Sequence, residues 1–132
     1  MVEPNTAVDQ LARDVIGAAI EVHRHLGPGF LESVYEEALV VELAMRQIPF
    51  ERQRPIAVNY KAHAVGEGRI DLVVAGDLLV ELKAVDMLAP IHKAQVISYL
   101  KATGLHLGLL INFNVPVLRA GIQRIVLSQH LD

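Results

Sequence analysis

The stretch from Leu105 to Phe113 constrains the fold most, because it is apolar at nearly every position. A strand with one face in water alternates apolar and polar residues, whereas a strand covered on both faces has no need to. We therefore expect Leu105–Phe113 to be a central strand with other elements packed on both of its faces. This predicts an α/β or α+β sandwich in which helices flank a mixed sheet.

Two helices are expected before the first strand. Apolar residues recur at helical spacing over Asp9–His25, and the Gly27-Pro28-Gly29 segment ends that pattern. A second helix is expected from Phe30 to Arg46. The apolar stripe of this second helix consists of Val34, Ala38, Val41 and Met45, widened by Leu31 and Leu39.

The period then changes to that of strands. Ile56, Val58 and Tyr60 alternate with polar or small residues, as in a half-buried strand, and Gly66-Glu67-Gly68 is expected to be a turn. The remaining expected elements are strands at Arg69–Ala75 and Leu78–Lys83, a loop at Val85–Ala89, a helix from Pro90 to about Ala102, and a last short strand or helix at Ile122–Leu127.

Composition narrows the class of protein. The 132 residues, 52% of them hydrophobic, suit one core, and without linkers or repeats we expect a single domain over residues 1–132. The net charge of −3 argues against non-specific coating of nucleic acid but allows metal-dependent chemistry on phosphates. The absence of cysteine excludes disulfides and thiolate zinc sites. With no basic leader and no apolar run of about 20 residues, we expect a cytoplasmic protein without membrane contact.

Three charged residues stand in two otherwise apolar strands: Asp71, Glu81 and Lys83. If Ala75-Gly76-Asp77 is a three-residue loop, Asp71 lies opposite Glu81, and Arg69 lies opposite Lys83. If the loop is Gly76-Asp77 alone, Asp71 pairs with Leu82, and the two carboxylates point to opposite faces.

The first register is stable only if something positive lies between the two carboxylates, because like charges directly opposite each other destabilise a sheet. A divalent cation held by oxygen ligands, with Lys83 beside it, would meet that need. The alternative is a set of edge-strand charges facing water. Three charges among Ile, Leu and Val weaken that alternative, since unpaired charges in apolar strands are costly.

Two further features have good structural explanations when taken alone. Glu32 would complement the dipole at a helix start, with Tyr35 three residues later as a core aromatic. Gln95 shares a helix face with Tyr99, and an isolated glutamine is usually a solvated surface residue. The six histidines form no HxxxH pair, and His23 and His25 make a poor zinc pair.

Together these motifs resemble a known family. Asp71 followed by Glu81-Leu82-Lys83 resembles the PD-(D/E)XK nuclease superfamily, and Gln95-x-x-x-Tyr99 is similar to the helix motif of its RecB-like branch. Gly29-x-x-Glu32-x-x-Tyr35 resembles the signature of the small GxxExxY family. The likeness covers roughly residues 16–126; Ile70 stands where many members have proline. It implies a restriction-endonuclease-like core of order α-β-β-β-α-β with an extra N-terminal helix.

The resemblance also implies roles for these residues. Asp71 and Glu81 would hold Mg²⁺ or Mn²⁺, with the Leu82 carbonyl and Glu32 as further ligands. Lys83 would position the attacking water and stabilise charge, while Gln95 and Tyr99 would orient water and the nucleic-acid backbone. The expected activity is hydrolysis of phosphodiester bonds in nucleic acid, with DNA favoured. The alternative is a catalytically inactive domain of this fold that acts through protein contacts or as a homodimer.

Overall fold

The computed structural model describes residues 6–127, which form four helices and five strands. In chain order these are α1 (Thr6–Leu26), α2 (Glu32–Met45), β1 (Phe50–Tyr60), β2 (His63–Val74), β3 (Leu78–Lys83), α3 (Pro90–Thr103), β4 (Leu107–Asn112), the short 3-10 helix η1 (Leu118–Gly121) and β5 (Ile122–Val126). No helix within residues 6–127 is long and apolar enough to cross a bilayer.

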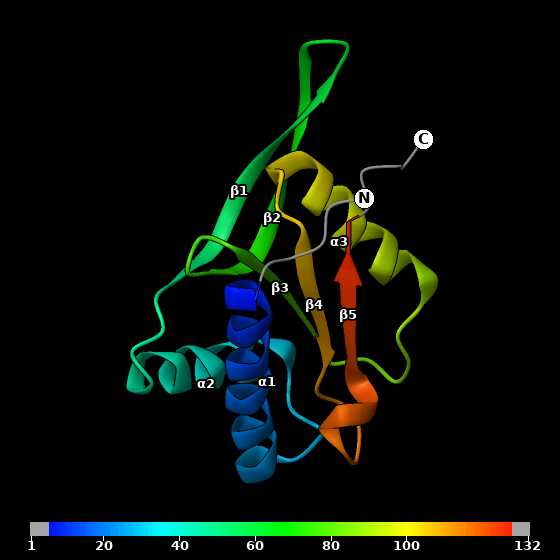
Figure 1. The fold of residues 1–132 in the computed structure, drawn as a ribbon. Helices are drawn as coiled ribbons and strands as arrows, with labels where there is room; N and C mark the ends of the chain where they lie inside the picture. Colours follow the sequence, from blue (N-terminus) through cyan, green and yellow to red (C-terminus); the bar gives the residue numbers. More distant parts are fainter. Residues whose placement is uncertain (1–5, 128–132) are drawn as a thin grey trace.

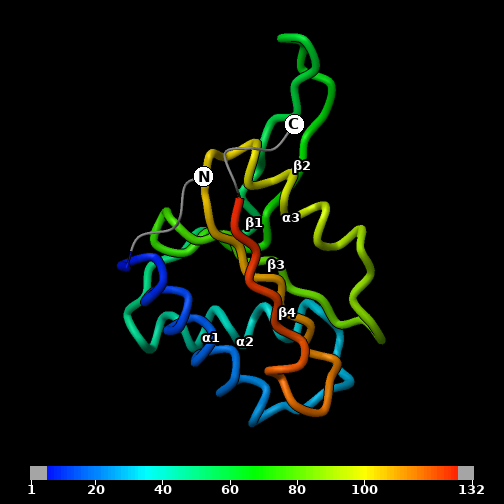
Figure 2. Tube along the Cα trace, turned by 45° about the vertical axis from the view of Figure 1, so that its right-hand side comes forward, coloured from blue at the N-terminus to red at the C-terminus, as the bar shows by residue number. Residues whose placement is uncertain are grey.

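The strands form one mixed sheet in the order β1-β2-β3-β4-β5, in which β3 and β4 run parallel and the other neighbours antiparallel. Helices α1 and α2 cover one face of the sheet, and α3 covers the other (Figures 1 and 2). This confirms the predicted α/β class, with the core order α-β-β-β-α-β running from α2 to β4 and α1 as the extra helix. The last element is a strand, and the 3-10 helix before it was not predicted.

Strand β4 has the central position predicted for it. All six of its residues are buried. Leu109 packs into the core cluster under α1 and α2, and Leu110 packs into the cluster under α3. A Cβ added at Gly108 would lie 2.8 Å from the side chain of Val96, so the glycine allows α3 to pack directly on the strand.

Most of the apolar stripe predicted for helix α2 faces outward, although Leu39 is buried and Ala38 packs against the core. Val41 and Met45 are 58% and 73% exposed, and Val34 is exposed as well. The buried face consists instead of Tyr35, Glu36, Leu39 and Leu43. Hydropathy alone could not predict this face, because Glu36 is buried against basic and amide partners from β1. The helix also begins at Glu32, two residues later than predicted.

The β1–β2 hairpin extends well beyond the body of the molecule (Figures 1 and 2). Its turn is at Lys61-Ala62, so the predicted turn at Gly66-Glu67-Gly68 is wrong. Every residue from Ala57 to Glu67 is exposed, and the predicted half-burial therefore applies to Ile56 but not to Val58 or Tyr60. We call residues 54–69 the arm.

Gly68 lies inside β2 for a steric reason. A Cβ at this position would approach the Tyr99 ring to 2.8 Å, and Ile56 across the ladder to 3.1 Å. The glycine therefore lets α3 pack against the base of the arm. Position 68 is therefore a glycine because Tyr99 packs closely on it, and it does not mark a turn.

Candidate active site

The β2–β3 hairpin has the predicted three-residue loop. Val74 pairs with Leu78, and the ladder continues to Leu72 and Val80, where it ends. The predicted pairing of Arg69 with Lys83 is therefore wrong: Arg69 pairs with Pro55 of β1, and Lys83 pairs with Asn112 of β4. The two strands diverge at the position that carries Asp71 on β2 and Glu81 on β3.

The Asp71 carboxylate occupies the gap left by the diverging strands. Its Oδ2 accepts a hydrogen bond of 2.8 Å from the backbone N–H of Leu82. Because the N–H and C=O of one strand residue point to the same edge, the Leu82 carbonyl also points towards β2. The next carbonyl, that of Lys83, points to the other edge and accepts from the Phe113 N–H.

Glu81 is the most unusual side chain of the site. It is 3% exposed, and its Oε1 has no hydrogen-bond partner among residues 6–127. Burial, and secondarily the neighbouring Asp71, raise the pKa of Glu81 to about 9. A buried carboxyl oxygen without a partner is costly unless a proton or a cation satisfies it.

Glu32 and Lys83 complete a group of four ionisable side chains. Glu32 begins α2 and is half-buried, and burial followed by the charge of Asp71 raises its pKa. The positive charge of Lys83 partly offsets these shifts, because it lowers the pKa of both Glu32 and Glu81. The fold thus brings together Glu32, Asp71, Glu81 and Lys83, which are far apart in the sequence.

The loop before α2 explains how Glu32 is placed. Tyr35 is fully buried and stacks on Phe113 with ring centroids 4.6 Å apart. Its hydroxyl donates to the Gly27 carbonyl (2.6 Å) and accepts from the Phe30 N–H (3.2 Å). Gly29 has a φ of +110°, which strongly favours glycine. Gly29 and Tyr35 therefore shape the loop. Glu32, the glutamate of the Gly29-x-x-Glu32-x-x-Tyr35 motif, interacts electrostatically with Asp71 and Lys83.

Gln95 and Tyr99 lie on α3, at the base of the arm. The Gln95 amide donates to the Tyr99 hydroxyl at 3.3 Å, and the Tyr99 ring packs over Gly68. No hydrogen bond within residues 6–127 joins this pair to Asp71, Glu81 or Lys83. The pair therefore flanks the strand that carries Asp71, with the Tyr99 ring packed against Gly68 of that strand.

A polar network connects α2 to Asp71 and was not predicted from the sequence. Gln53 of β1 donates to Glu36 and to Asp71, and Arg52 pairs with Glu36 at 3.0 Å. Hydrogen bonds to Glu37 and Glu36 raise the pKa of Arg52. No local pattern predicts this network, because it depends on the β1–β2 register, which the misplaced turn concealed.

Asn112 is a second residue that the sequence analysis passed over. It is buried at the end of β4; its side-chain amide donates to the Val85 carbonyl (2.9 Å) and accepts from the Val85 N–H (3.1 Å). It therefore fixes the chain directly after Lys83. The signal was a lone polar residue inside an apolar run.

The donor set fits a hard divalent cation. Within residues 6–127 no group of three or more His, Cys, Asp or Glu side chains is arranged to hold a metal. The available oxygens are those of Asp71 and Glu81, together with the Leu82 carbonyl that faces the same gap. Mg²⁺ and Mn²⁺ favour such carboxylate and carbonyl ligands, completed by water, and a cation would satisfy the partnerless Oε1 of Glu81.

A family model described as the PD-(D/E)XK nuclease superfamily matches residues 9–125. No curated protein matches the chain. The matched range contains every candidate site residue named above.

Proposed function

The chain belongs to the PD-(D/E)XK nuclease superfamily, and from this membership we propose that it is a Mg²⁺- or Mn²⁺-dependent nuclease that hydrolyses phosphodiester bonds in nucleic acid, with DNA favoured. We also propose that it is a member of the GxxExxY family, because Gly29-x-x-Glu32-x-x-Tyr35 resembles the signature of that family. One observation carries the proposal: Glu81 is buried beside Asp71 with a carboxyl oxygen that has no protein partner. The expected location is the cytoplasm.

Each site residue has a role in this mechanism. Asp71, Glu81 and the Leu82 carbonyl would hold the cation, with Glu32 binding it directly or through water. When bound, the ion supplies Lewis-acid activation of the phosphate and of the attacking water. Lys83 would position that water and stabilise the negative charge that develops on the phosphate.

Gln95 and Tyr99 would act on the substrate from α3. Their mutual hydrogen bond fixes the orientation of the tyrosine hydroxyl, and the close packing on Gly68 fixes the ring. From this position they would orient water and the backbone of the strand to be cut. Their action would be one of positioning, which is worth most when the groups are held rigidly.

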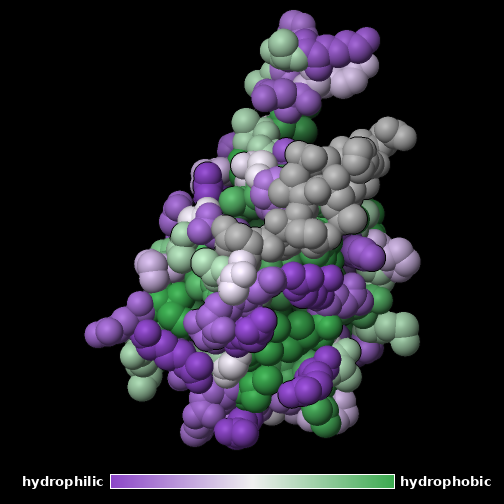
Figure 3. Space-filling view, in the orientation of Figure 1, coloured by the Kyte–Doolittle hydropathy of each residue, from purple (hydrophilic) through white to green (hydrophobic). Residues whose placement is uncertain are grey.

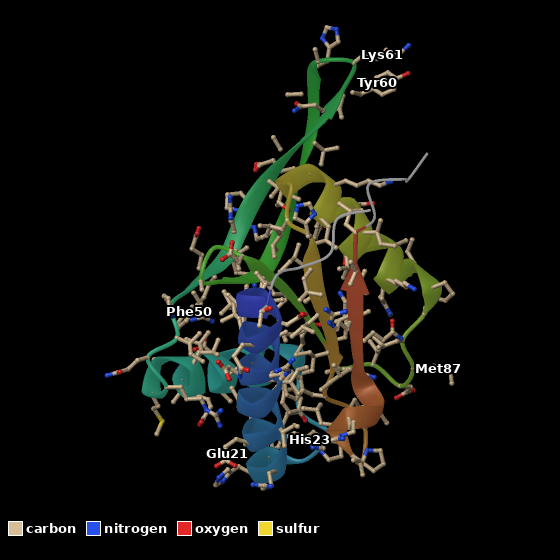
Figure 4. The ribbon with its side chains drawn as sticks, viewed as in Figure 1. Glu21, His23, Phe50, Tyr60, Lys61 and Met87 are labelled. Atoms are coloured by element: carbon tan, nitrogen blue, oxygen red, sulfur yellow. The ribbon has the colours of Figure 1, made fainter. Side chains whose placement is uncertain are left out.

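The arm provides a surface for the nucleic acid. It carries three basic residues, Arg54, Lys61 and Arg69, against one acidic residue, Glu67, in a chain whose net charge is −3. Tyr60 and Lys61 lie at its far end, with the Lys61 ammonium 5.4 Å from the centre of the Tyr60 ring (Figure 4). A two-stranded ribbon fits the major groove of DNA, where cationic side chains contact phosphates.

The direct test is cleavage of single- and double-stranded DNA and RNA with Mg²⁺, with Mn²⁺ and with EDTA. We expect metal-dependent cleavage by the wild type that EDTA abolishes. Glu81→Gln should be inactive although it folds. Absence of cleavage by the wild type across all substrates and both metals would contradict the proposal.

A second candidate function rests on the outward face of α2. Leu31, Val41 and Met45 are exposed there, with Met45 73% accessible. An exposed apolar stripe is typical of a protein-contact surface. It favours the alternative of an inactive nuclease-fold domain that acts through protein contacts or as a homodimer. Light scattering would detect the dimer, and Met45→Lys should dissociate it.

A further inference from the structure

Gln53 donates both hydrogens of its side-chain amide to carboxylates. The Nε2 atom lies 2.8 Å from Oε1 of Glu36 on α2 and 3.3 Å from Oδ1 of Asp71 on β2. An amide nitrogen carries two donors, so both are used. The neutral group thereby separates two acidic side chains that would otherwise repel each other.

Glu36 is a firm anchor for this bridge. It is 9% exposed, and its second oxygen accepts from Arg52, at 3.0 Å from Nη2 and 3.3 Å from Nε. Arg52 in turn is held at 2.6 Å by Glu37. The Gln53 amide is therefore bonded to a carboxylate that is already paired with a cation of the same strand, Arg52.

At the other end, Asp71 is held at both oxygens. Oδ1 accepts from Gln53, and Oδ2 accepts from the Leu82 N–H at 2.8 Å. Two donors on different oxygens fix the plane of the carboxylate as well as its position. The remaining lone pairs then point in one defined direction, which is the condition for selective cation binding.

The backbone of Gln53 is unusual for a strand. Its φ is +49°, although its neighbours Arg52 and Arg54 pair regularly with Leu72 and Ile70. A side chain other than glycine, asparagine or aspartate is uncommon there, and such a conformation is costly unless something compensates it. At the same point the β2 side chains change face, with Leu72 towards α2 and Ile70 towards α3.

We infer that Gln53 is a positioning residue of the metal site, which holds the Asp71 carboxylate in its ligating orientation by tying it to Glu36. The inference rests on the proposed function as far as it concerns the metal. The role of Gln53 in fixing Asp71 concerns the protein alone and can be measured without metal. Gln53 is not a catalytic residue, since it reaches the site only through Asp71.

The test uses Gln53→Gly, because glycine accepts the positive φ and removes the amide. The matched control is Gln47→Gly, since Gln47 is an exposed glutamine with a φ of +59° in the turn after α2. The metal-free readout is hydrogen exchange of the Leu82 amide, measured by NMR. The second readout is Mn²⁺ affinity, measured by calorimetry on the same full-length proteins.

We expect Gln53→Gly to melt no lower than the wild type, yet to exchange the Leu82 amide about tenfold faster. Its Mn²⁺ affinity should fall by about tenfold or more, as for other residues that orient metal ligands. Gln47→Gly should change neither readout. Gln53→Met, which keeps the length of the side chain and loses the donors, should reproduce both losses.

Unchanged Leu82 exchange in Gln53→Gly and in Gln53→Met would overturn the inference. Faster exchange with undiminished Mn²⁺ affinity would also overturn it, because Asp71 would then ligate without its anchor. A wild type that binds no Mn²⁺ would refute the proposed function instead. In that case Leu82 exchange would still decide whether Gln53 fixes Asp71.

Discussion

The two ends of strand β2 have opposite surroundings. From Leu72 to Val74 the strand pairs with β1 on one side and β3 on the other, and all three residues are buried. From His63 to Glu67 it pairs with β1 alone, and every residue is exposed. In Figure 3 the arm stands clear of the body, with a largely hydrophilic tip.

This difference corresponds to two separate requirements of the proposed nuclease activity. A catalytic group has to be held rigidly, and Asp71 is held by hydrogen bonds from the Gln53 amide and from the Leu82 N–H. A long polymeric substrate requires a surface that extends away from the site of the reaction, and in the proposed function the arm would provide that surface. In the proposed function, strand β2 connects the arm to the buried part of the sheet, and Asp71 lies between these two regions.

The largest expected effect comes from the buried end. Lys83→Met keeps the aliphatic stem and removes the charge, so the fold and cation binding should survive. Turnover should fall by about 10²–10⁴-fold, the usual worth of a positioned charge. Cleavage rate and metal-induced thermal shift would be measured together on both proteins. If the variant cuts at nearly the wild-type rate, Lys83 is not catalytic.

Added Mg²⁺ or Mn²⁺ should raise the melting temperature of the wild type, because in the proposed function the cation binds only the folded carboxylate pair. At about 100 times Kd the gain is about 2.7 kcal/mol. Asp71→Asn or Glu81→Gln should lose most of it, whereas Lys61→Ala on the arm should keep it. An equal gain in all these variants would mean that the ion binds elsewhere.

The stability of the metal-free protein should depend on pH through Glu81. Its pKa is about 9 in the folded protein against 4.5 ordinarily, so between these values the folded state holds a proton that the unfolded state releases. The free energy of unfolding should therefore fall as pH rises across this range. Glu81→Gln should remove the effect and melt about 3 °C or more above the wild type near pH 8.5 in EDTA. Parallel melting profiles for the two proteins would contradict this.

The arm should give the smallest effect, and one confined to binding. Lys61→Ala should weaken nucleic-acid affinity a few-fold and lower the salt dependence by about one phosphate contact. The rate at saturating substrate and the melting temperature should not change. The matched control is Glu67→Ala, which removes the arm's acidic residue and should strengthen binding. If both variants bind as the wild type does, the substrate does not contact the arm.

The sequence predicted those parts of the fold that depend on local chemistry. The apolar run identified β4. The three-residue loop between β2 and β3 was also predicted, although the Arg69–Lys83 pair expected with it does not form. These inferences succeeded because a strand's period and a short loop fix geometry over a few residues. The loop also satisfies its own backbone, with the Asp77 N–H donating to the Val74 carbonyl.

The parts that failed depend on distant partners. The chain turns at Lys61 and Ala62, with φ values of 49° and 66° and without a glycine, whereas Gly68 nearby is needed for the packing of Tyr99. With the turn misplaced, Gln53 could not be aligned with Asp71. Glu36 could not be recognised as buried, because its burial requires Arg52 and Gln53 from another element.

The parallel pairing of β3 with β4 determines when the site matures during folding. The β2–β3 hairpin is local in sequence, but β4 reaches β3 only after the chain has crossed over through α3. Contacts between distant segments form late, because closing a long loop costs entropy. We therefore expect Glu81 to remain hydrated, with an ordinary acidity, until Leu110 aligns beside it. The raised pKa of Glu81 would thus appear in one of the last steps of folding.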